Sequence, residues 1–393
     1  MFVVKSEKAQ IKVWLDKPSD IEPGCLEQAK NVANLPFIFH HVALMPDTHQ
    51  GYGMPIGGVA CLKDVLCPNM VGVDIGCGMN YVETNINVGD VSKKDMEKII
   101  DEIYKVIPVG FSHQANALEL PETLGYGPEK NEQLRESIFP SIQKQLGTLG
   151  GGNHFIELQR REDNNKLCIM LHSGSRNVGK QVCDCFNSIA KDLNKKFFSA
   201  FDPKYDLAFL PIGTKKAEDY FDWMTYAMNF AYHNREHMMN KIKEIVNKYL
   251  STEFHSEINK HHNYASLENH YGHNVWVHRK GAISARQGEI GIIPGAMGSF
   301  SYIVEGLGNH MSYNSCSHGA GRRMGRKKAA EKFDNVNVLN ELSLNNIVAK
   351  LKNENEAGEE CMHAYKDIEM VMGNQNDLVK IIKKLKTIAV IKG

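Results

Sequence analysis

Short runs of apolar residues, separated by loops rich in glycine and small polar residues, are the dominant pattern along the chain. The runs are dense in β-branched and aromatic residues, as is typical of buried strands. The expected strands cover residues 11–14, 37–45, 59–67, 155–158, 167–171, 275–279, 283–285 and 387–391. The two runs at 275–279 and 283–285 are close enough to predict a hairpin, joined through Lys280 and Gly281.

Apolar positions with helical spacing occur in several stretches between these runs. Ser92 and Asp95 form a capping box that begins an amphipathic helix ending at about Val106. Residues 110–127 have little periodicity and are expected to form a surface excursion. The other expected helices cover residues 26–33, 178–198, 216–250 (as one or two helices) and 377–385. No repeat or linker divides the chain, so we expect one domain over residues 1–393 with helical insertions.

Composition and charge narrow the class of protein. With 46 basic and 46 acidic side chains, the chain has no formal net charge at pH 7. This argues against a protein that coats nucleic acid non-specifically, but it allows a local basic groove. We see no signal peptide, no apolar run of membrane-spanning length and no disulfide-framework spacing among nine cysteines. A reducing cytoplasm without membrane association is therefore expected.

Several expected strands end in a small polar loop that carries one potential metal ligand. These ligands are Asp74, Cys77, His154, His172 and one of His261 or His262. Their mixture of carboxylate, thiolate and imidazole suits a divalent transition metal better than calcium or magnesium. The paired cysteine motifs of a structural zinc site are absent from the sequence, so the predicted metal is catalytic.

A second metal pattern competes with this one. His233, Glu236 and His237 fit the H-x-x-E-H pattern of the inverzincin proteases on an expected helix. The pattern has only three fixed residues and no obvious third ligand downstream. Most such matches are solvated helix faces, so we interpret this one in the same way.

A candidate nucleophile lies in a heptapeptide near the carboxyl terminus. His318 is followed by Gly319, Ala320 and Gly321, and then by Arg322. Glycine lets backbone approach a ligand closely, and arginine offers planar donors suited to phosphate. A histidine in this setting is able to attack phosphorus, but a short glycine motif alone is weak evidence.

The glycine-rich motifs also form an ordered set. They are Met-Pro-Asp at 45–47, Val-Asp-Ile-Gly-Cys-Gly at 73–78, Gly-Gly-Gly-Asn-His-Phe-Ile-Glu at 150–157, His-Ser-Gly-Ser-Arg at 172–176, His-Asn at 262–263, Ser-His-Gly-Ala-Gly-Arg at 317–322 and Ile-Lys-Gly at 391–393. From about residue 10 to the last residue, this set resembles the RtcB family of RNA ligases, in the family's order. The ordered set is far more specific than any one of its motifs.

The resemblance implies a fold, an activity and partners. The fold would be α+β, with central mixed or antiparallel sheets flanked by helices and a metal site at converging strand ends. The enzyme would use GTP and a pair of Mn²⁺ ions to join RNA 2′,3′-cyclic phosphate or 3′-phosphate ends to 5′-hydroxyl ends, in transfer-RNA splicing or RNA repair. RNA with such ends is the implied partner. The resemblance also suggests an archease-like activator as a protein partner.

The resemblance also assigns roles to residues. His318 would be the nucleophile that takes GMP through a phosphoramidate bond. The matching manganese ligands are Asp74, Cys77, His154, His172 and His262, the last preferred over His261 because it directly precedes Asn263. Arg176 and Arg322 would hold RNA phosphates. Nucleotide contacts would come from Asn153, Glu157, Pro294, Gly295, Met297, Ser301, His318, Gly319, Ala320, Gly321 and Lys392.

One position departs from the family, and two other functions compete. Many relatives have serine where Ala296 stands, so a nucleotide hydrogen bond is expected to be missing there.

The first alternative is a metal-dependent RNA phosphatase or other hydrolase that uses the same metal centre without His318. The second is an RNA-binding protein without activity, which the presence of the nucleophile and all five ligands argues against.

Overall fold

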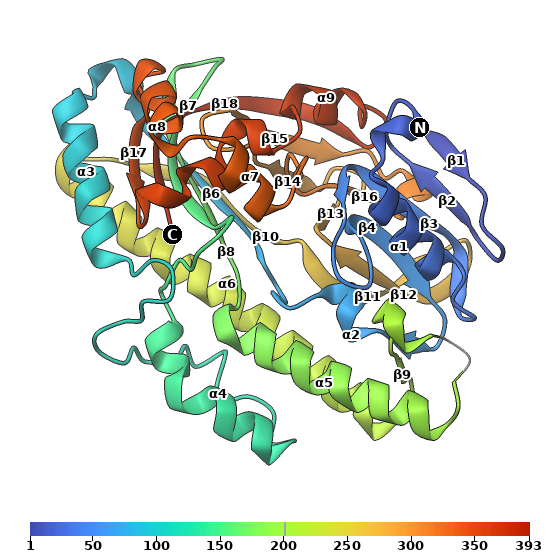
Figure 1. Cartoon of the computed structure of the whole chain (residues 1–393). Coiled ribbons are helices and arrows are strands. Elements are labelled where there is room, and N and C mark those ends of the chain that lie inside the picture. Colours follow the sequence, from blue (N-terminus) through green and yellow to red (C-terminus); the bar gives the residue numbers. More distant parts are fainter. Residues whose placement is uncertain (200–201) are drawn as a thin grey trace.

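Two large β-sheets lie at the centre of the structure, a computed structural model that describes residues 1–199 and 202–393 (Figure 1). The first sheet has six strands in the order β1-β2-β3-β4-β12-β11, and all neighbours are antiparallel except β2 and β3. Its strands are β1 (Phe2–Val4), β2 (Gln10–Val13), β3 (Ile38–His49), β4 (Ile56–Leu62), β11 (Asn263–His270) and β12 (His273–Lys280).

The second sheet has eight strands, seven of them in the order β10-β6-β8-β7-β18-β15-β14, with β17 paired to the end of β18. These are β6 (Gly78–Asn87), β7 (Phe155–Arg161), β8 (Lys166–Ser173), β10 (Phe254–His261), β14 (Ile290–Ile293), β15 (Phe300–Gly306), β17 (Val348–Leu351) and β18 (Val379–Lys392). Only His262 separates β10 from β11, so the chain passes there from the second sheet to the first. Two small sheets pair β5 (Val65–Leu66) with β9 (Leu210–Pro211) and β13 (Ala282–Ser284) with β16 (Ser315–Ser317).

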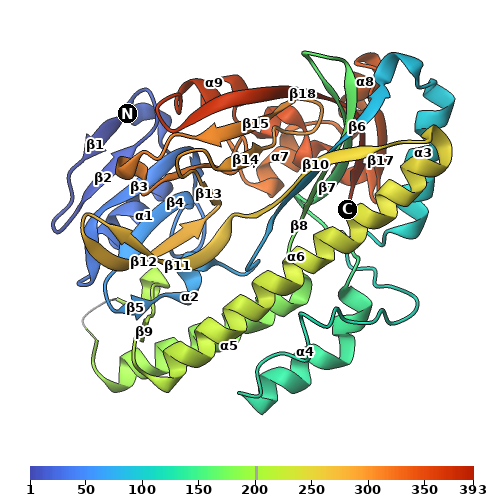
Figure 2. The same ribbon diagram turned by 180° about the vertical axis from the view of Figure 1, so that it is seen from behind.

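Helices pack around the sheets, and the longest is α6 (Lys215–Leu250), which begins where Thr214 accepts a hydrogen bond from the backbone of Ala217. Figure 2 shows α6 crossing the back of the molecule beside α5 (Arg176–Lys196), with α4 (Glu132–Gln145) on the outer side. The others are α1 (Pro23–Ala33), α2 (Pro68–Val71), α3 (Lys93–Val106), α7 (Arg326–Lys332), α8 (Asn335–Leu344) and α9 (Ile368–Gly373). Short 3-10 turns lie at Pro18–Asp20, Val88–Asp90, Pro203–Tyr205, His310–Ser312, Glu354–Glu360 and Met362–Ala364. No helix in the described ranges has both the length and the apolar character to cross a membrane.

The alternation of side chains along β8 explains how the second sheet presents polar residues to a site. Leu167, Ile169 and Leu171 join a core with α3 and α6 on one face of the sheet. Cys168 and Met170 join a different core, with α7 and α8 on the other face. Successive side chains of a strand point to opposite faces, so His172 shares the second face. The same alternation places Glu157 of β7 on that face with Phe155.

Most of the expected elements are confirmed, and three expectations are wrong. The hairpin does not form: β12 pairs with β4 and β11, whereas β13 pairs with β16, because the chain changes direction at Gly281, whose φ is +61°. The expected helix at 377–385 is instead the first half of β18, where pairing with β15 overrides helical spacing. The expected strand at 59–67 breaks into β4 and β5.

Candidate active site

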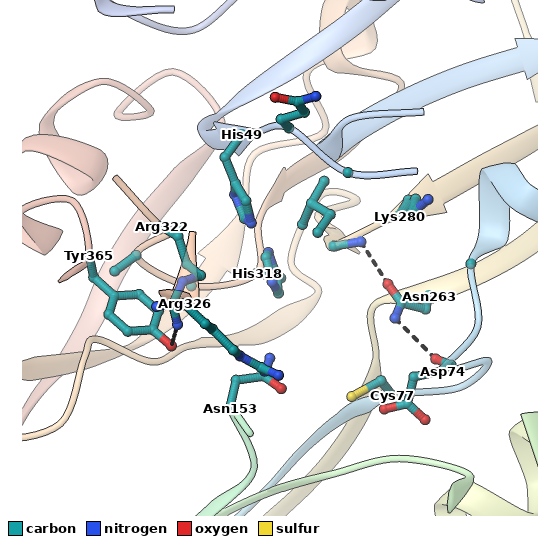
Figure 3. Close-up of a pocket in the computed structure, with 18 of the residues that line it drawn as sticks. His49, Asp74, Cys77, Asn153, Asn263, Lys280, His318, Arg322, Arg326 and Tyr365 are labelled. Carbon is teal, nitrogen blue, oxygen red and sulfur yellow. Dashed lines mark hydrogen bonds between the residues drawn. The ribbon is translucent and has the colours of Figure 1, made fainter. Parts of the chain in front are cut away.

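A cavity of about 1230 Å³ opens where the ends of β3, β8 and β18 meet (Figure 3). It is larger than most small-molecule pockets, which measure roughly 300–1,000 Å³. Of the predicted site residues, His154, Ser301 and Arg176 do not line it, although His154 contacts Cys77 and Ser301 contacts Gly295. The predicted residues that line it are Asp74, Cys77, Asn153, Glu157, His172, His262, Pro294, Gly295, Met297, His318, Gly319, Ala320, Gly321, Arg322 and Lys392.

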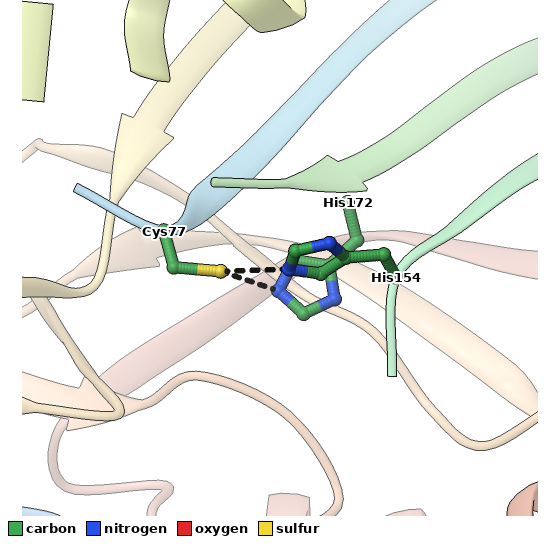
Figure 4. A group of neighbouring side chains, drawn as sticks. All are labelled: Cys77, His154 and His172. Atoms are coloured by element: carbon green, nitrogen blue, oxygen red, sulfur yellow. Dashed lines mark hydrogen bonds between the residues drawn. The ribbon is translucent and has the colours of Figure 1, made fainter. Parts of the chain in front are cut away.

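Three of the predicted metal ligands, Cys77, His154 and His172, form a cluster in the described part of the chain (Figure 4). Their ligand atoms all lie within 4.8 Å of one another. Sγ of Cys77 is 3.4 Å from Nε2 of His154 and 3.3 Å from Nε2 of His172. The cysteine precedes β6, His154 precedes β7 and His172 lies near the end of β8. Neighbouring strands of one sheet therefore bring the three side chains together.

Asp74 and His262 extend the cluster in two directions. Oδ2 of Asp74 lies 3.1 Å from Nε2 of His154, and Nε2 of His262 lies 3.4 Å from Nε2 of His172. The donors thus form two groups that share Cys77, one with Asp74 and His154 and one with His172 and His262. His261 lies outside them, because its Nδ1 faces the backbone oxygen of Gly76 at 2.9 Å.

The ligand atoms are oriented and protonated in a way that fits divalent metal ions. Nδ1 of His154 lies 2.9 Å from the oxygen of Leu149, and Nδ1 of His172 lies 3.0 Å from that of Asn153. Donation from these Nδ1 atoms leaves both Nε2 lone pairs facing the cluster, the arrangement typical of metal-binding histidines. Burial holds the pKa of His172 far below its ordinary value, so the ring is neutral.

The thiol of Cys77 completes this fit. Burial, reinforced by the charge of Asp74, raises its pKa well above the ordinary value. A bound cation would replace the thiol proton, as it does at other cysteine sites. Mixed oxygen, sulfur and nitrogen donors of this kind suit transition metals.

His318 lies beside the cluster and is held by Asp47 of β3. The His318 ring is edge-on to that of His262, with 4.8 Å between centroids. Nδ1 of His318 is 2.7 Å from Oδ2 of Asp47, which also accepts the backbone N–H groups of His318 and Gly319. Burial raises the pKa of Asp47, but the charge and hydrogen bond of His318 outweigh it and lower the net value. When the His318 ring is neutral, donation of its Nδ1–H to this ionised carboxylate leaves the Nε2 lone pair available.

Lys366 joins the strand that carries Asp47 to the loop that carries His318. Its Nζ donates to the backbone oxygens of Pro46 at 3.0 Å and Thr48 at 2.5 Å, on either side of Asp47. Its backbone N–H donates to the oxygen of Gly321 at 2.9 Å. Gly321 has a φ of +73°, and a Cβ there would lie 2.0 Å from the oxygen of Asp47. The close approach of these two segments thus requires glycine.

Glu157 is a buried carboxylate on the cavity wall. Its Oε2 accepts hydrogen bonds from Nε2 of Gln159 at 2.6 Å and from Oγ1 of Thr387 at 2.9 Å. Burial raises its pKa to about 7, although both hydrogen bonds and the charge of Lys392 act in the opposite direction. A group of this kind accepts hydrogen bonds in its ionised form and is costly to leave unpaired.

The other nucleotide-contact candidates lie near Glu157. Nζ of Lys392 donates to Oε2 of Glu360 at 3.1 Å and to the oxygen of Gly152 at 3.2 Å. Oγ of Ser301 accepts from Nε2 of Gln159 and from the backbone of Gly295. Carboxylate and ammonium groups thus line the cavity together, and the hydroxyl of Ser301 lies behind them.

The two arginines predicted to bind RNA have extensive contacts within the protein. Arg322 on the cavity wall donates to Oε1 of Glu360 and to Oη of Tyr365, each at 3.1 Å. Arg176 begins α5 with a φ of +56° and donates to Oγ1 of Thr148 at 3.3 Å. Contact of either residue with RNA stays a prediction.

The residues of the H-x-x-E-H pattern do not gather into a group of three ligand atoms in the described part of the chain. Nε2 of His233 lies 3.1 Å from Oγ1 of Thr123, and its Nδ1 lies 2.9 Å from Glu236. His237 packs against Gly147. Across the described residues the only clustered group of three ligands is that of Cys77, His154 and His172. The two histidines thus form no ligand cluster, but they are packed against other segments rather than solvated, with the His233 side chain only 16% exposed.

Sequence reasoning missed several residues of the site. Asp47 belongs to the Met-Pro-Asp motif and lies in β3, but no role was assigned to it. Lys280, whose Nζ donates to the backbone oxygens of Tyr52 and Asn69, lies in the misassigned hairpin. Lys366 and Glu360 belong to no motif, so only the folded chain reveals them.

Comparison with known proteins agrees with the geometry. A family model described as tRNA-splicing ligase RtcB matches residues 28–125 and 121–393. The chain is 37% identical over 412 residues to the RNA-splicing ligase RtcB of Escherichia coli, covering 100% of this chain and 99% of that protein. It is 31% identical to the tRNA-splicing ligase RtcB of Thermococcus kodakarensis, with 94% and 91% of the two chains covered. By sequence, and with the site geometry above in agreement, the chain belongs to the RtcB family.

Proposed function

We propose that the protein is a GTP- and Mn²⁺-dependent RNA ligase that joins 2′,3′-cyclic phosphate or 3′-phosphate ends to 5′-hydroxyl ends. The observation that carries the proposal is the pairing of Asp47 with His318, beside a cluster of metal donors in one cavity. The relatives' names as RNA-splicing ligases agree with an RNA substrate. Transfer-RNA splicing and RNA repair are the processes in which such ends arise.

In the first step, Nε2 of His318 attacks the α-phosphorus of GTP. A P–N bond to the ring forms, and the bond to the β-phosphate oxygen breaks, releasing pyrophosphate. The ring becomes cationic, and the carboxylate of Asp47, 2.7 Å from Nδ1, stabilises that charge. The same contact fixes the tautomer before the attack, because Nδ1 carries the proton.

In the second and third steps, the guanylyl group activates the RNA. An oxygen of the RNA 3′-phosphate attacks the phosphorus on His318, breaking the P–N bond and leaving the ring neutral. The 5′-hydroxyl of the other RNA then attacks the 3′-phosphorus, and GMP departs. A 2′,3′-cyclic phosphate must first be opened by water to a 3′-phosphate.

The metal ligands proposed for a pair of Mn²⁺ ions are Asp74, Cys77, His154, His172 and His262. When bound, divalent ions neutralise phosphate oxygens and lower the pKa of bound water. Glu157 and Lys392 are proposed to read the guanine, because a carboxylate accepts its ring and amino N–H groups and an ammonium donates to its oxygen. Asn153 and the segments 294–297 and 318–321 would contact the rest of the nucleotide, with Ser301 behind them.

The proposal is tested by incubating the purified protein with Mn²⁺ and GTP labelled at the α-phosphate, followed by denaturing electrophoresis. We expect a labelled protein band that acid removes, as it does other phosphoramidates. The band should be absent from His318→Ala, which should still bind Mn²⁺ because His318 is not among the proposed ligands. His237→Ala is the matched control, since this histidine lies outside the cavity lining, and should label normally.

The same experiment separates the ligase from its alternative. A metal-bound wild-type protein that gives no labelled band would support an RNA phosphatase or other hydrolase that uses the metal centre alone. A labelled His318→Ala protein would show that the nucleophile is misassigned.

A further inference from the structure

The middle of α6 carries two buried polar residues that the proposed reaction does not use. Asn234 and Arg235 lie inside the H-x-x-E-H pattern, between His233 and Glu236, and both have exposed fractions of 0%. Arginine is almost never fully buried unless it is paired. Their burial therefore has to be explained by the hydrogen bonds that Asn234 and Arg235 form, which differ from those of the flanking histidines.

Arg235 contacts the chain next to the ligands of both groups. Its Nη1 donates to the backbone oxygens of Gly76 and Ser173, each at 2.9 Å. Gly76 precedes Cys77, and Ser173 follows His172. Its Nη2 lies 3.0 Å from Nδ1 of His261, the residue before His262. One planar guanidinium thus contacts three ligand-bearing segments, which a single-point ammonium would not do equally well.

Asn234 connects the loop that leads to His154 with the segment that carries His172. Its Oδ1 accepts the backbone N–H groups of Gly147 at 2.8 Å and Thr148 at 3.1 Å. Its Nδ2 donates to the oxygen of Thr148 at 3.1 Å and, across to the His172 segment, to the oxygen of Gly174 at 3.1 Å. The loop from 147 to 153 leads to His154, and its Leu149 lies against Nδ1 of that histidine.

The charge of Arg235 has no ion-pair partner among the described residues. Its contacts are carbonyl oxygens, the amide of Asn259 at 2.8 Å and the ring of His261. A buried cation without a carboxylate partner is costly. Burial lowers the pKa of Arg235, and the negative charge of Asp74 in the metal centre acts against that burial. The burial of Arg235 is thus explained by its hydrogen bonds to the ligand-bearing segments and not by any contact within α6.

We propose that Asn234 and Arg235 are positioning residues that hold the four ligand-bearing segments in register, so that the donors of both groups converge. Neither residue touches metal or substrate. The inference rests on the proposed metal centre, and it assigns a role to the one pattern in the sequence that the reaction leaves unused.

The test measures metal binding to the free protein, without GTP or RNA. Mn²⁺ is titrated by calorimetry into wild type, Arg235→Lys, Arg235→Met and Asn234→Asp. Loss of a residue that orients metal ligands typically weakens metal binding by about 10–100-fold. We expect that loss for Arg235→Met and Asn234→Asp, and a smaller one for Arg235→Lys, which keeps the charge and part of the hydrogen bonding.

The control is Val246→Ala, a fully buried position on the same helix about 16 Å away at 1.5 Å per residue. It should lower the melting temperature and leave Mn²⁺ affinity unchanged. Co²⁺ gives a second readout, because its thiolate charge-transfer absorption reports ligation by Cys77. That band should weaken in Arg235→Met and persist in Val246→Ala.

Each outcome decides the proposal. If the Arg235 and Asn234 variants bind Mn²⁺ as tightly as wild type, the two residues have no positioning role. The proposed metal centre would still stand. Affinity losses that merely follow the loss of folded protein in the melting curves would overturn it as well. A wild-type protein that binds neither Mn²⁺ nor Co²⁺ would overturn the metal centre, and this inference with it.

Discussion

Asp47 and His318 lie 271 positions apart in the sequence, yet Oδ2 of the one is 2.7 Å from Nδ1 of the other. An aspartate in this position fixes the ring tautomer and stabilises the ring when it becomes cationic. In serine proteases, replacing the corresponding aspartate by asparagine slows the reaction by about 10⁴-fold. The pairing of Asp47 with His318 thus makes the first step of the proposed reaction depend on a residue outside the glycine motif.

We predict that Asp47→Asn slows guanylylation by about 10²-fold or more, because the asparagine amide neither stabilises the cation nor enforces the tautomer. Single-turnover labelling with α-labelled GTP measures the rate, and GTP affinity should change little. Asp163→Asn, at a side chain that is 57% exposed, is the control. Equal rates for Asp47→Asn and wild type would remove Asp47 from the mechanism.

Lys366→Met should destabilise the protein and slow guanylylation together. The substitution leaves the backbone oxygens of Pro46 and Thr48 without their donor, and each buried group left unpaired costs about 1–3 kcal/mol. Asp47 lies between them, so its carboxylate loses a fixed position. Chemical denaturation and single-turnover labelling measure the two effects. Lys180→Met, at a side chain that is 60% exposed, should change neither, and an unimpaired Lys366→Met protein would contradict the role assigned to Lys366.

The raised pKa of Glu157 makes a prediction about pH and stability. Its ordinary pKa is 4.5 and its folded value is about 7, so the folded state keeps a proton that the unfolded state loses between these values. The stability contributed by protonated Glu157 is therefore present below pH 4.5 and is lost as pH rises to about 7. A shift of this size corresponds to roughly 3 kcal/mol.

Glu157→Gln should therefore stabilise the free protein above pH 7 and flatten its pH dependence between pH 5 and 7. It should also weaken GTP binding, since the glutamine accepts one guanine N–H where the carboxylate accepts two. Denaturation at several pH values and GTP titration measure the two effects. Glu244→Gln, at a side chain that is 64% exposed, is the control. A variant that loses stability at pH 8 would show that the carboxylate of Glu157 is stabilising as an anion.

Local signals account for the parts of the fold that the sequence predicts. Ser92 caps α3 as expected, accepting a hydrogen bond from the backbone of Asp95, because capping depends only on neighbouring residues. The strands that deliver His154 and His172 were also recognised, since both are short apolar runs. By contrast, residues 377–385 have the spacing of a helix, but from Val379 onward they belong to β18, whose partners β15 and β7 are distant in sequence.

The residues of the candidate site likewise fall into those that local sequence signals predict and those that only the folded chain reveals. Residues in glycine-rich motifs could be proposed from the sequence, because a loop whose backbone must approach a ligand closely is rich in glycine. The contacts of Lys366 and Arg235 could not, since both act through backbone oxygens that any residue supplies. The choice between His261 and His262 depended on the family likeness, and the structure places only His262 beside His172.

The shared position of Cys77 predicts how substitutions divide the metal centre. Its Sγ lies near Nε2 of both His154 and His172, so Cys77→Ser should weaken both Mn²⁺ sites at once. Oδ2 of Asp74 lies 3.1 Å from Nε2 of His154, and Asp74 belongs to only one of the two donor groups, so Asp74→Asn should leave one site near wild-type affinity. Calorimetry or spin resonance gives the stoichiometry. Cys25→Ser is the control, because this buried thiol contacts Thr48 and lies outside the cluster. If Cys77→Ser still binds two Mn²⁺ ions with unchanged affinity, the cysteine is not a ligand, and the two donor groups are not joined through its sulfur.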